Sequence, residues 1–363
     1  FKQSEWLPFH RAFHDALIDK GFPYDPDMNH PESEGVGPIP MNNPDGVRMS
    51  TGLTYINISR HRLNLTIKAN VMVRRVLFDG KKAIGAEVES GGERFTVEAD
   101  EIILSAGAIA SPHLLMLSGV GPADQLEKHG IPVVHELPGV GQNLRDHPIV
   151  PVVYKVKPEH PQDPAEPRYQ LALRYTATGS DDRNDMQILP SAFSSPIGAP
   201  DPYEQEGVRF TCVLELANGF GELTLASNDP ADQPHLNYRY FEDAWDRQRM
   251  RECVRLAMDL VEHPLYENII EERLQPKEAD LESNDTLDAW MLLTTVNTTH
   301  SSGTCKLGPA SDNSAVVDQY CRVHGLENIR VADASVMPNV VRANTNSTTI
   351  MIGERVADWI KEG

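Results

Sequence analysis

Residues 299–309 read T-H-S-S-G-T-C-K-L-G-P, and residues 342–360 read R-A-N-T-N-S-T-T-I-M-I-G-E-R-V-A-D-W-I. The first segment places one histidine, His300, at the start of a loop of small residues. The second places Asn344 just before a pattern that predicts an amphipathic helix. Between the two segments, the short apolar run at residues 329–332 predicts a strand. The rest of the chain is arranged around this strand, loop and helix.

A second informative segment runs from residue 101 to residue 121. E-I-I-L-S is a short apolar strand, and A-G-A-I-A is a crossing of small residues. S-P-H-L-L-M-L-S-G then predicts a helix with Ser111 as its cap, Pro112 at its first position and Gly119 at its end. A strand, a glycine loop and a helix allow the backbone to approach a cofactor closely. Many α/β proteins share this pattern, so it is weakly specific by itself.

These segments, together with L-P-G-V-G-Q-N-L-R-D-H-P at residues 137–148, resemble the glucose-methanol-choline (GMC) family of FAD-dependent oxidoreductases. The family's hallmark G-A-I-A-S-P-H-L-L-M-L-S-G-V-G-P is matched nearly position for position. The resemblance implies FAD as the cofactor and a small-molecule alcohol as the substrate. It implies an alcohol oxidase or dehydrogenase, similar to choline dehydrogenase, with His300 as the catalytic base and Asn344 as its partner.

The implied chemistry suits those two residue types. A neutral imidazole, with an ordinary pKa of about 6.5, can take the hydroxyl proton near neutral pH. An amide can hold the same oxygen without competing for the proton. Without the resemblance, a lone histidine or asparagine is more often structural. We therefore interpret His147, in the D-H-P end of its motif, as structural. The resemblance also implies a set of cofactor-binding residues: Val73, Gly107, Thr299, Asp333, Ala334, Thr345 and Asn346.

The composition excludes several other classes of protein. The chain has 363 residues, and its net charge of −20 argues against a nucleic-acid surface, which needs clustered Lys and Arg. No apolar run approaches the length of a membrane span. The four cysteines have no metal-ligand spacing, so no metal site is predicted, and they are typical of reduced thiols in a cytoplasmic protein.

The predicted fold class is α/β (α+β): a GMC-type FAD-binding domain, incomplete in this chain, and a substrate domain built on an antiparallel sheet with helices. The predicted division is 1–60 for a substrate-domain helix and linking loop, 61–149 for part of the FAD-binding domain, 150–295 for the substrate-binding domain, and 296–363 for the carboxy-terminal part of the FAD-binding domain. The periodicity predicts helices at 1–22, 242–263 and from 348, a loop at 23–46, and strands at 63–67, 71–78, 83–88, 93–97, 150–156, 186–192, 209–216 and 222–226.

One family feature is not found in the sequence. The family binds the FAD pyrophosphate with an amino-terminal G-x-G-x-x-G loop, and no such motif occurs here. We therefore expect a missing amino-terminal FAD-binding segment as a partner, either a separate chain produced by cleavage or a disordered part of the same chain. A fragment alone would leave Ile102, Ile103 and Val331 unburied. Two alternative functions stay open: an FAD-containing cyanohydrin lyase of the same fold, or a flavin-free, non-catalytic fragment.

Overall fold

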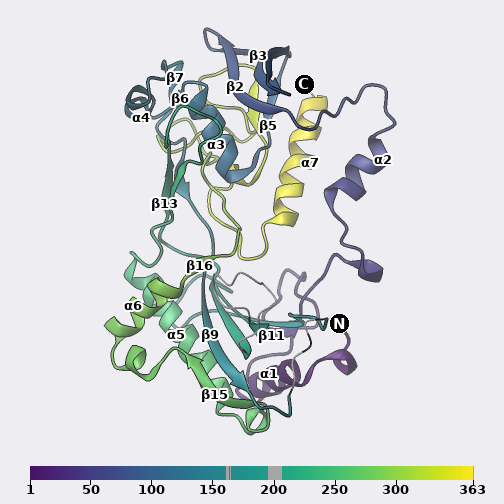
Figure 1. Cartoon of the computed structure of the whole chain (residues 1–363), viewed down its shortest axis with the longest axis vertical. Coiled ribbons are helices and arrows are strands. Elements are labelled where there is room, and N and C mark those ends of the chain that lie inside the picture. The colour runs from purple at the N-terminus through teal and green to yellow at the C-terminus, as the bar shows by residue number, and fades with distance from the viewer. Residues whose placement is uncertain (161–162, 164, 195–206, 363) are drawn as a thin grey trace.

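The chain is organised around two hydrophobic cores, one in each half of the molecule drawn in Figure 1. The computed structural model describes residues 1–160, 163, 165–194 and 207–362. The α-helices are α1 (Pro8–Asp19), α2 (Asn57–Ser59), α3 (Gly107–Leu117), α4 (Ala123–Lys128), α5 (Ala244–Val261), α6 (Asn284–Thr294) and α7 (Asn346–Glu362). Short 3-10 helices are η1 (Gln3–Glu5), η2 (Pro44–Gly46), η4 (Pro264–Tyr266), η5 (Glu278–Leu281) and η6 (Ala334–Val336), and η3 (Gly52–Ile56) is a π-helical turn.

Most of the strands belong to antiparallel sheets. They are β1 (Gly35–Pro38), β2 (Met72–Asp79), β3 (Lys82–Ser90), β4 (Glu93–Glu98), β5 (Ile102–Leu104), β6 (Val120–Gly121), β7 (His135–Glu136), β8 (Gln142–Leu144), β9 (Pro148–Val156), β10 (Leu171–Tyr175), β11 (Met186–Ser194), β12 (Gly207–Leu214), β13 (Gly221–Thr224), β14 (His235–Asn237), β15 (Ile270–Gln275), β16 (Val296–Asn297) and β17 (Ile329–Val331). Among the described residues, the largest sheet has seven strands, in the order β1-β10-β11-β12-β9-β15 with β16 paired to β9.

The first core lies between this antiparallel sheet and helices α1, α5 and α6. Phe13 of α1 stacks on Phe210 of β12, with ring centroids 5.8 Å apart, and both rings are fully buried. Met250 and Val254 of α5 are buried in the same cluster. Burying a side chain of this size contributes about 1.5–3 kcal/mol. Helix α1 begins at Pro8, a residue whose fixed φ and missing N–H suit a first helical position.

Strand β1 lies within the segment that the sequence predicts as a loop. It pairs with β10, and two of its glycines allow the preceding chain to lie against it. The Cβ that Gly35 lacks would lie 2.0 Å from the Pro23 carbonyl oxygen, and that of Gly37 would lie 1.7 Å from the Asp25 carbonyl oxygen. The prediction of a loop over 23–46 is therefore wrong at residues 35–38, because glycine is here required by close strand packing rather than by a turn.

The second core lies under the parallel pair of β5 and β17 and is enclosed by α3 and the sheet β2-β3-β4. Val331 of β17 is fully buried, so the expectation that it would be left unburied is wrong. Ile103 of β5 is 40% exposed, as expected. All three residues of β17 are therefore buried, whereas β5 is buried at Leu104 and partly open at Ile102 and Ile103.

Helix α3 begins at Gly107, not at Pro112 as predicted from the sequence. Pro112 cannot donate a hydrogen bond to the carbonyl of Ala108 four residues earlier. The buried hydroxyl of Thr304 donates to that carbonyl instead, at 2.5 Å. Ser111 does not cap the helix at its own position, but accepts a hydrogen bond from the backbone N–H of Ala106. The helix thus continues through the proline because a distant loop satisfies the carbonyl that Pro112 leaves free.

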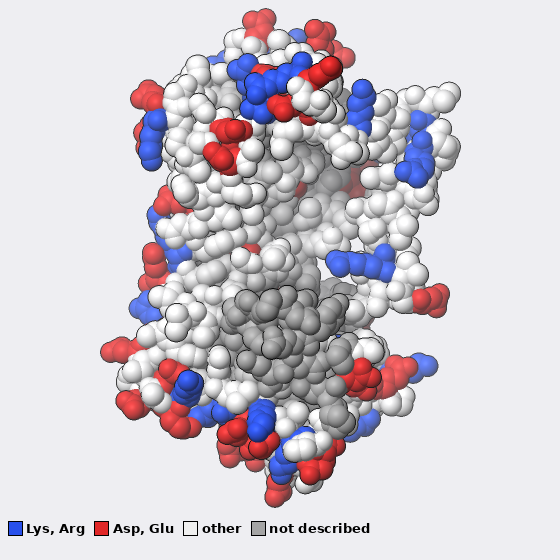
Figure 2. All heavy atoms as spheres, viewed as in Figure 1, with Lys and Arg blue, Asp and Glu red and all other residues white. Residues whose placement is uncertain are grey.

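The arm that carries η3 and α2 stands apart from the body of the molecule (Figure 1). Residues 63–67 of this arm are exposed and form no strand, so the predicted strand there is wrong. A strand needs a neighbouring ladder, and in the described chain none pairs with this segment. Figure 2 shows a hollow between the arm and the body, and on that face the charged side chains lie mostly toward the two ends of the molecule.

Helix α7 borders the same open region (Figure 1). Its apolar residues recur at helical spacing, as the sequence predicts, yet Val356 alone is buried. Met351 is 51% exposed and Ile360 is 38% exposed. No helix of the described chain is long and apolar enough to cross a membrane.

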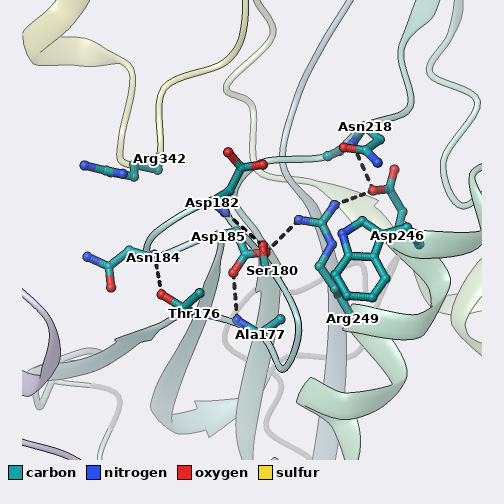
Figure 3. A network of polar contacts seen from close by, with 12 residues as sticks. Thr176, Ala177, Ser180, Asp182, Asn184, Asp185, Asn218, Asp246, Arg249 and Arg342 are labelled. Carbon is teal, nitrogen blue, oxygen red and sulfur yellow. Dashed lines mark hydrogen bonds and ion pairs between the residues drawn. The ribbon is translucent and has the colours of Figure 1, made fainter.

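A buried ion-pair network ties α5 to the large sheet (Figure 3). Arg249 of α5 donates to Asp185 at 2.8 Å and to Asp246 at 2.6 Å, and all three side chains are at most 2% exposed. Asp185 also accepts from the backbone of Ala177, and Asp246 accepts from the backbone of Asn218. One guanidinium and two carboxylates therefore connect the β10–β11 turn, the loop after β12 and the helix.

Replacing Arg249 by Met should destabilise the protein by about 3–5 kcal/mol, because it leaves two buried carboxylates without their cation. The measurement is the free energy of unfolding from urea denaturation. The matched control is Arg255→Met on the same helix, where the guanidinium is exposed and bonds only Asn284 in the described chain; it should change stability by less than about 0.5 kcal/mol. Equal effects of the two variants would contradict this account of the network.

Candidate active site

The motif at 137–148 and the loop at 299–309 lie side by side. Arg145 and Ser302 form an antiparallel bridge, with N···O distances of 3.0 and 2.9 Å. Gly303 has a φ of +86°, and the Cβ that it lacks would lie 2.5 Å from the Asn143 carbonyl oxygen. Only glycine fits this backbone approach without strain. The two sequence motifs therefore form one structural unit, which places the start of the second loop next to Asp146 and His147.

Asp146 holds the loop that carries His300. Its Oδ1 accepts hydrogen bonds from the backbone N–H groups of His147, Thr298 and His300 at 2.8, 3.2 and 3.1 Å. The same oxygen accepts from the Thr298 hydroxyl at 2.8 Å, and Oδ2 accepts from the Ser301 hydroxyl at 3.0 Å. The side chain is 3% exposed. A buried carboxylate with this many donors fixes the local backbone strongly.

The imidazole of His300 has polar contacts at both ring nitrogens. Its Nδ1 lies 3.0 Å from Nδ1 of His147 and 2.9 Å from the hydroxyl oxygen of Thr298. Its Nε2 lies 3.1 Å from the amide nitrogen of Asn344. Burial, and then the neighbouring His147, lower the pKa of His300 below its ordinary value. A neutral imidazole is therefore the form present near pH 7, as a proton acceptor requires.

Behind His300 lies a buried pair, His147 and Glu215. Nε2 of His147 lies 2.8 Å from the carbonyl oxygen of Val341 and 3.3 Å from Oε2 of Glu215. Burial lowers the pKa of His147 to about 4, and burial raises the pKa of Glu215 to about 7. The contact is therefore not an ion pair at neutral pH, because His147 carries no charge there. Oε2 of Glu215 makes no hydrogen bond with the described residues.

Asn344 lies at the surface, two residues before the start of α7. The structure thus brings His300 and Asn344 together although 44 positions separate them in the chain. The positive end of the helix dipole at Asn346 faces the same neighbourhood, and it favours negative charge there.

Three of the residues assigned to cofactor binding meet at the start of α3. Gly107 has a φ of +86°, and open space lies where its Cβ would be. Its N–H donates to Oδ2 of Asp333 at 2.9 Å. Asp333 also accepts from Ser111 and twice from Ser335, so its buried carboxylate is fully used inside the protein. Ala334 follows in η6, and its carbonyl accepts from the backbone of Gly303. Only backbone atoms of Asp333 are left for a ligand.

The other four residues assigned to cofactor binding lie further apart. Val73 is on β2, an edge strand of its sheet, and its side chain is 39% exposed. Thr299 adopts a left-handed conformation with a φ of 62° directly before His300. Thr345 is buried, and Asn346 is exposed at the first position of α7. The structure therefore does not gather all seven residues into one cluster, but distributes them along the second core and the loop of His300.

The sequence alone does not predict the polar surroundings of His300. It predicts a structural role for His147, and the structure places this ring against His300 because its D-H-P motif follows directly on the segment that pairs with the loop of His300. Asp146, in the same motif, was not singled out. Glu215 has one weak signal, an acidic residue within the apolar run V-L-E-L. Within the described ranges, no three His, Cys, Asp or Glu side chains are grouped as a metal site requires. All four cysteines are free and buried.

Replacing Glu215 by Gln should stabilise the protein increasingly as the pH rises from about 4.5 to about 7. The pKa of Glu215 in the folded protein is about 7, above its ordinary value of 4.5. The folded protein therefore keeps the Glu215 proton at pH values where the unfolded chain has lost it. The free energy of unfolding of the unchanged protein falls as the pH rises from about 4.5 through about 7. The gain of the variant should reach roughly 3 kcal/mol above pH 7. Urea denaturation of both proteins at pH 5 and pH 8 measures it, and a difference that does not change with pH would refute it.

Family models and curated relatives indicate the same family for this chain. Two models described as GMC oxidoreductase match residues 2–149 and 218–353. The chain is 33% identical to an oxygen-dependent choline dehydrogenase of Photobacterium profundum and 36% identical to a mitochondrial choline dehydrogenase of Mus musculus. Each alignment covers 98% of this chain, which spans 66% and 63% of the length of these two curated relatives.

Solved structures agree in fold. The crystal structure of pyridoxine 4-oxidase from Mesorbium loti matches with a TM-score of 0.92 and 26% identity, over 100% of this chain and 71% of the other. A formate oxidase structure matches with a TM-score of 0.86 and 25% identity, over 99% of this chain and 71% of the other. The expected fold class, α/β (α+β) with helices on an antiparallel sheet, is confirmed.

One expectation about the family match is not borne out. The amino-terminal family model already matches at residue 2, so the comparisons do not support a missing amino-terminal FAD-binding segment as a partner. The resemblance itself is confirmed by both family models and by relatives that are aligned along nearly the whole chain. The chain belongs to the GMC oxidoreductase family.

Proposed function

We propose that this chain belongs to an FAD-dependent enzyme that oxidises a small-molecule alcohol, with His300 as the base and Asn344 as the group that holds the substrate oxygen. The observation that carries the proposal is the contact between Nε2 of His300 and the amide of Asn344, 3.1 Å apart, with the buried Asp146 fixing the loop beneath. Nε2 of His300 and the side-chain amide of Asn344 thus lie together at the protein surface, where the hydroxyl group of a substrate could bind.

The residues have separate roles in this proposal. Nε2 of His300 accepts the hydroxyl proton, and the amide of Asn344 donates to the oxygen that loses it. The carboxylates of Asp146 and Glu215 act on His300 in the opposite direction to burial, since both favour its charged form. They would therefore stabilise the imidazolium once the proton has moved. Family membership implies FAD, which when bound supplies the acceptor for the hydride that leaves the alcohol carbon.

The chain offers groups that fit such a cofactor. The open space at Gly107 allows a ligand to approach the start of α3, and Val73 lies on an edge strand of its sheet. The first turn of α7 begins at Asn346, directly after Thr345, and its unpaired backbone N–H groups favour negative charge nearby. Thr299, Asp333 and Ala334 would contribute backbone atoms. The positions of Gly107, Val73 and Asn346 support their assignment to cofactor binding, and we extend the proposal to Thr299, Asp333, Ala334 and Thr345.

The relatives support an alcohol as the substrate class. Two are named for choline and one solved structure for pyridoxine, and both compounds carry a primary alcohol group. We also propose the division 1–60, 61–149, 150–295 and 296–363, because the first core is built largely from 150–295 and α1, and the second largely from 61–149 and 296–363. The four buried thiols support a reducing compartment such as the cytoplasm.

Replacing His300 by Ala should slow reduction of the flavin by an alcohol by about 10² or more, because the hydroxyl group loses its proton acceptor. Flavin binding should be largely unchanged. The measurement is the rate at which the flavin absorbance is lost after rapid mixing of the FAD-loaded protein with an alcohol panel. Added imidazole should restore part of the rate in this variant, since it can occupy the space of the missing ring.

The matched control is His160→Ala in the loop after β9, which should reduce the flavin at the original rate. An unchanged rate in the His300 variant would contradict its role as base. Failure of every alcohol to bleach the flavin, together with cleavage of a cyanohydrin, would favour the lyase alternative. A protein that binds no flavin would favour the non-catalytic alternative.

A further inference from the structure

The hydrogen bonds around His300 determine which of its ring nitrogens carries the proton. Two neighbours of Nδ1 decide this, the Thr298 hydroxyl and the ring of His147. The Thr298 hydroxyl has a single hydrogen. It is donated to Oδ1 of Asp146, an oxygen that already accepts three backbone N–H groups. Toward Nδ1 of His300, 2.9 Å away, the Thr298 oxygen can therefore only accept.

The second neighbour of Nδ1 leads to the same result. Nε2 of His147 lies 2.8 Å from the carbonyl oxygen of Val341, which can only accept, so the proton of His147 is on Nε2. Nδ1 of the neutral His147 ring then presents a lone pair to Nδ1 of His300, 3.0 Å away. If His147 donated instead, Nδ1 of His300 would present its lone pair to the Thr298 oxygen, and two acceptors would meet.

We propose that His147 and Thr298 are positioning residues that hold His300 in the tautomer with its proton on Nδ1, so that the lone pair is on Nε2 beside Asn344. Both residues present an acceptor to Nδ1, and neither contacts Nε2. A neutral histidine has one ring proton, so satisfying both acceptors leaves Nε2 free to accept. The amide nitrogen of Asn344 is a donor toward that lone pair.

The consequence for activity rests on the proposed function, whereas the tautomer itself does not. If His300 is the base, the lone pair must face the place where the alcohol binds before the proton can move. Without the two acceptors the ring could protonate on Nε2, which places a donor where an acceptor is needed. His147 is thereby more than a packed ring under the loop: it determines which nitrogen reacts.

The test reads the tautomer directly by NMR of the full chain labelled with ¹⁵N-histidine, in which protonated and unprotonated ring nitrogens resonate far apart. The variant His300→Gln assigns the signal by its disappearance. We expect a protonated Nδ1 and an unprotonated Nε2 for His300 at neutral pH. A proton on Nε2 in the unchanged protein would overturn the inference. Apart from the variant that assigns the signal, this measurement needs no substitution, and it needs no substrate.

Variants separate the two acceptors. His147→Asn places an amide oxygen near the position of Nδ1, so the Nδ1–H tautomer should persist. The double variant His147→Leu with Thr298→Val removes both acceptors and should shift His300 toward Nε2–H, with flavin reduction slowed by roughly 10-fold to 100-fold. The control His10→Asn removes another buried histidine that bonds a carbonyl, and it should leave His300 unchanged.

The outcomes distinguish this inference from the proposed function. An Nδ1–H tautomer in a protein that oxidises no alcohol would leave the inference standing and remove its catalytic consequence. An unchanged tautomer in the double variant would overturn the roles of His147 and Thr298 even if alcohol oxidation were found. Loss of activity with an unchanged KM and a shifted tautomer would support both, because a merely structural residue would not move the proton within the ring.

Discussion

The carboxylate of Asp146 is the interaction on which the candidate site depends. It accepts from the backbone N–H of the adjacent His147, and from two backbone N–H groups and two hydroxyls of a loop that lies about 150 positions further along the chain. The carboxylate is buried, so these hydrogen bonds form where water is excluded. A single buried acceptor thereby sets the conformation of the residues on both sides of His300. Its cost in desolvation is offset because every donor around it is satisfied.

The two cores place this carboxylate at their junction. Strand β9 of the large sheet starts at Pro148, the last residue of the motif that contains Asp146, while the preceding β8 pairs with β13. On the other side, the loop of His300 leads through Gly303 and Thr304 to α3 of the second core. The site is therefore held by both halves of the molecule, and movement of one half relative to the other would act directly on His300.

Local patterns predicted the elements well where their causes are local. β17, α7 and the β2–β3–β4 meander follow from periodicity and turn residues. The start of α3 could not be predicted, because the hydroxyl that compensates for Pro112 comes from Thr304, 196 residues from the carbonyl it bonds. For the same reason, the sequence does not predict the contacts of His147 and Glu215. Their partners are distant in the chain, and no spacing rule brings them together. The segment at 63–67 has the composition of a strand. A strand forms only where a neighbouring strand pairs with it, and this segment has no partner among the described strands.

The long separations in sequence have a consequence for the order in which the molecule can assemble. The bond from Gly107 to Asp333 closes a loop of 226 residues, and the bond from Asp146 to His300 closes one of 154. The large sheet, by contrast, has all its strands by Asn297. A chain emerging from the ribosome can therefore complete its first core while Asn344 is still unsynthesised. The imidazole and its amide can meet only after Asn344 has been synthesised, so a chain that stops before this residue cannot hold a finished site.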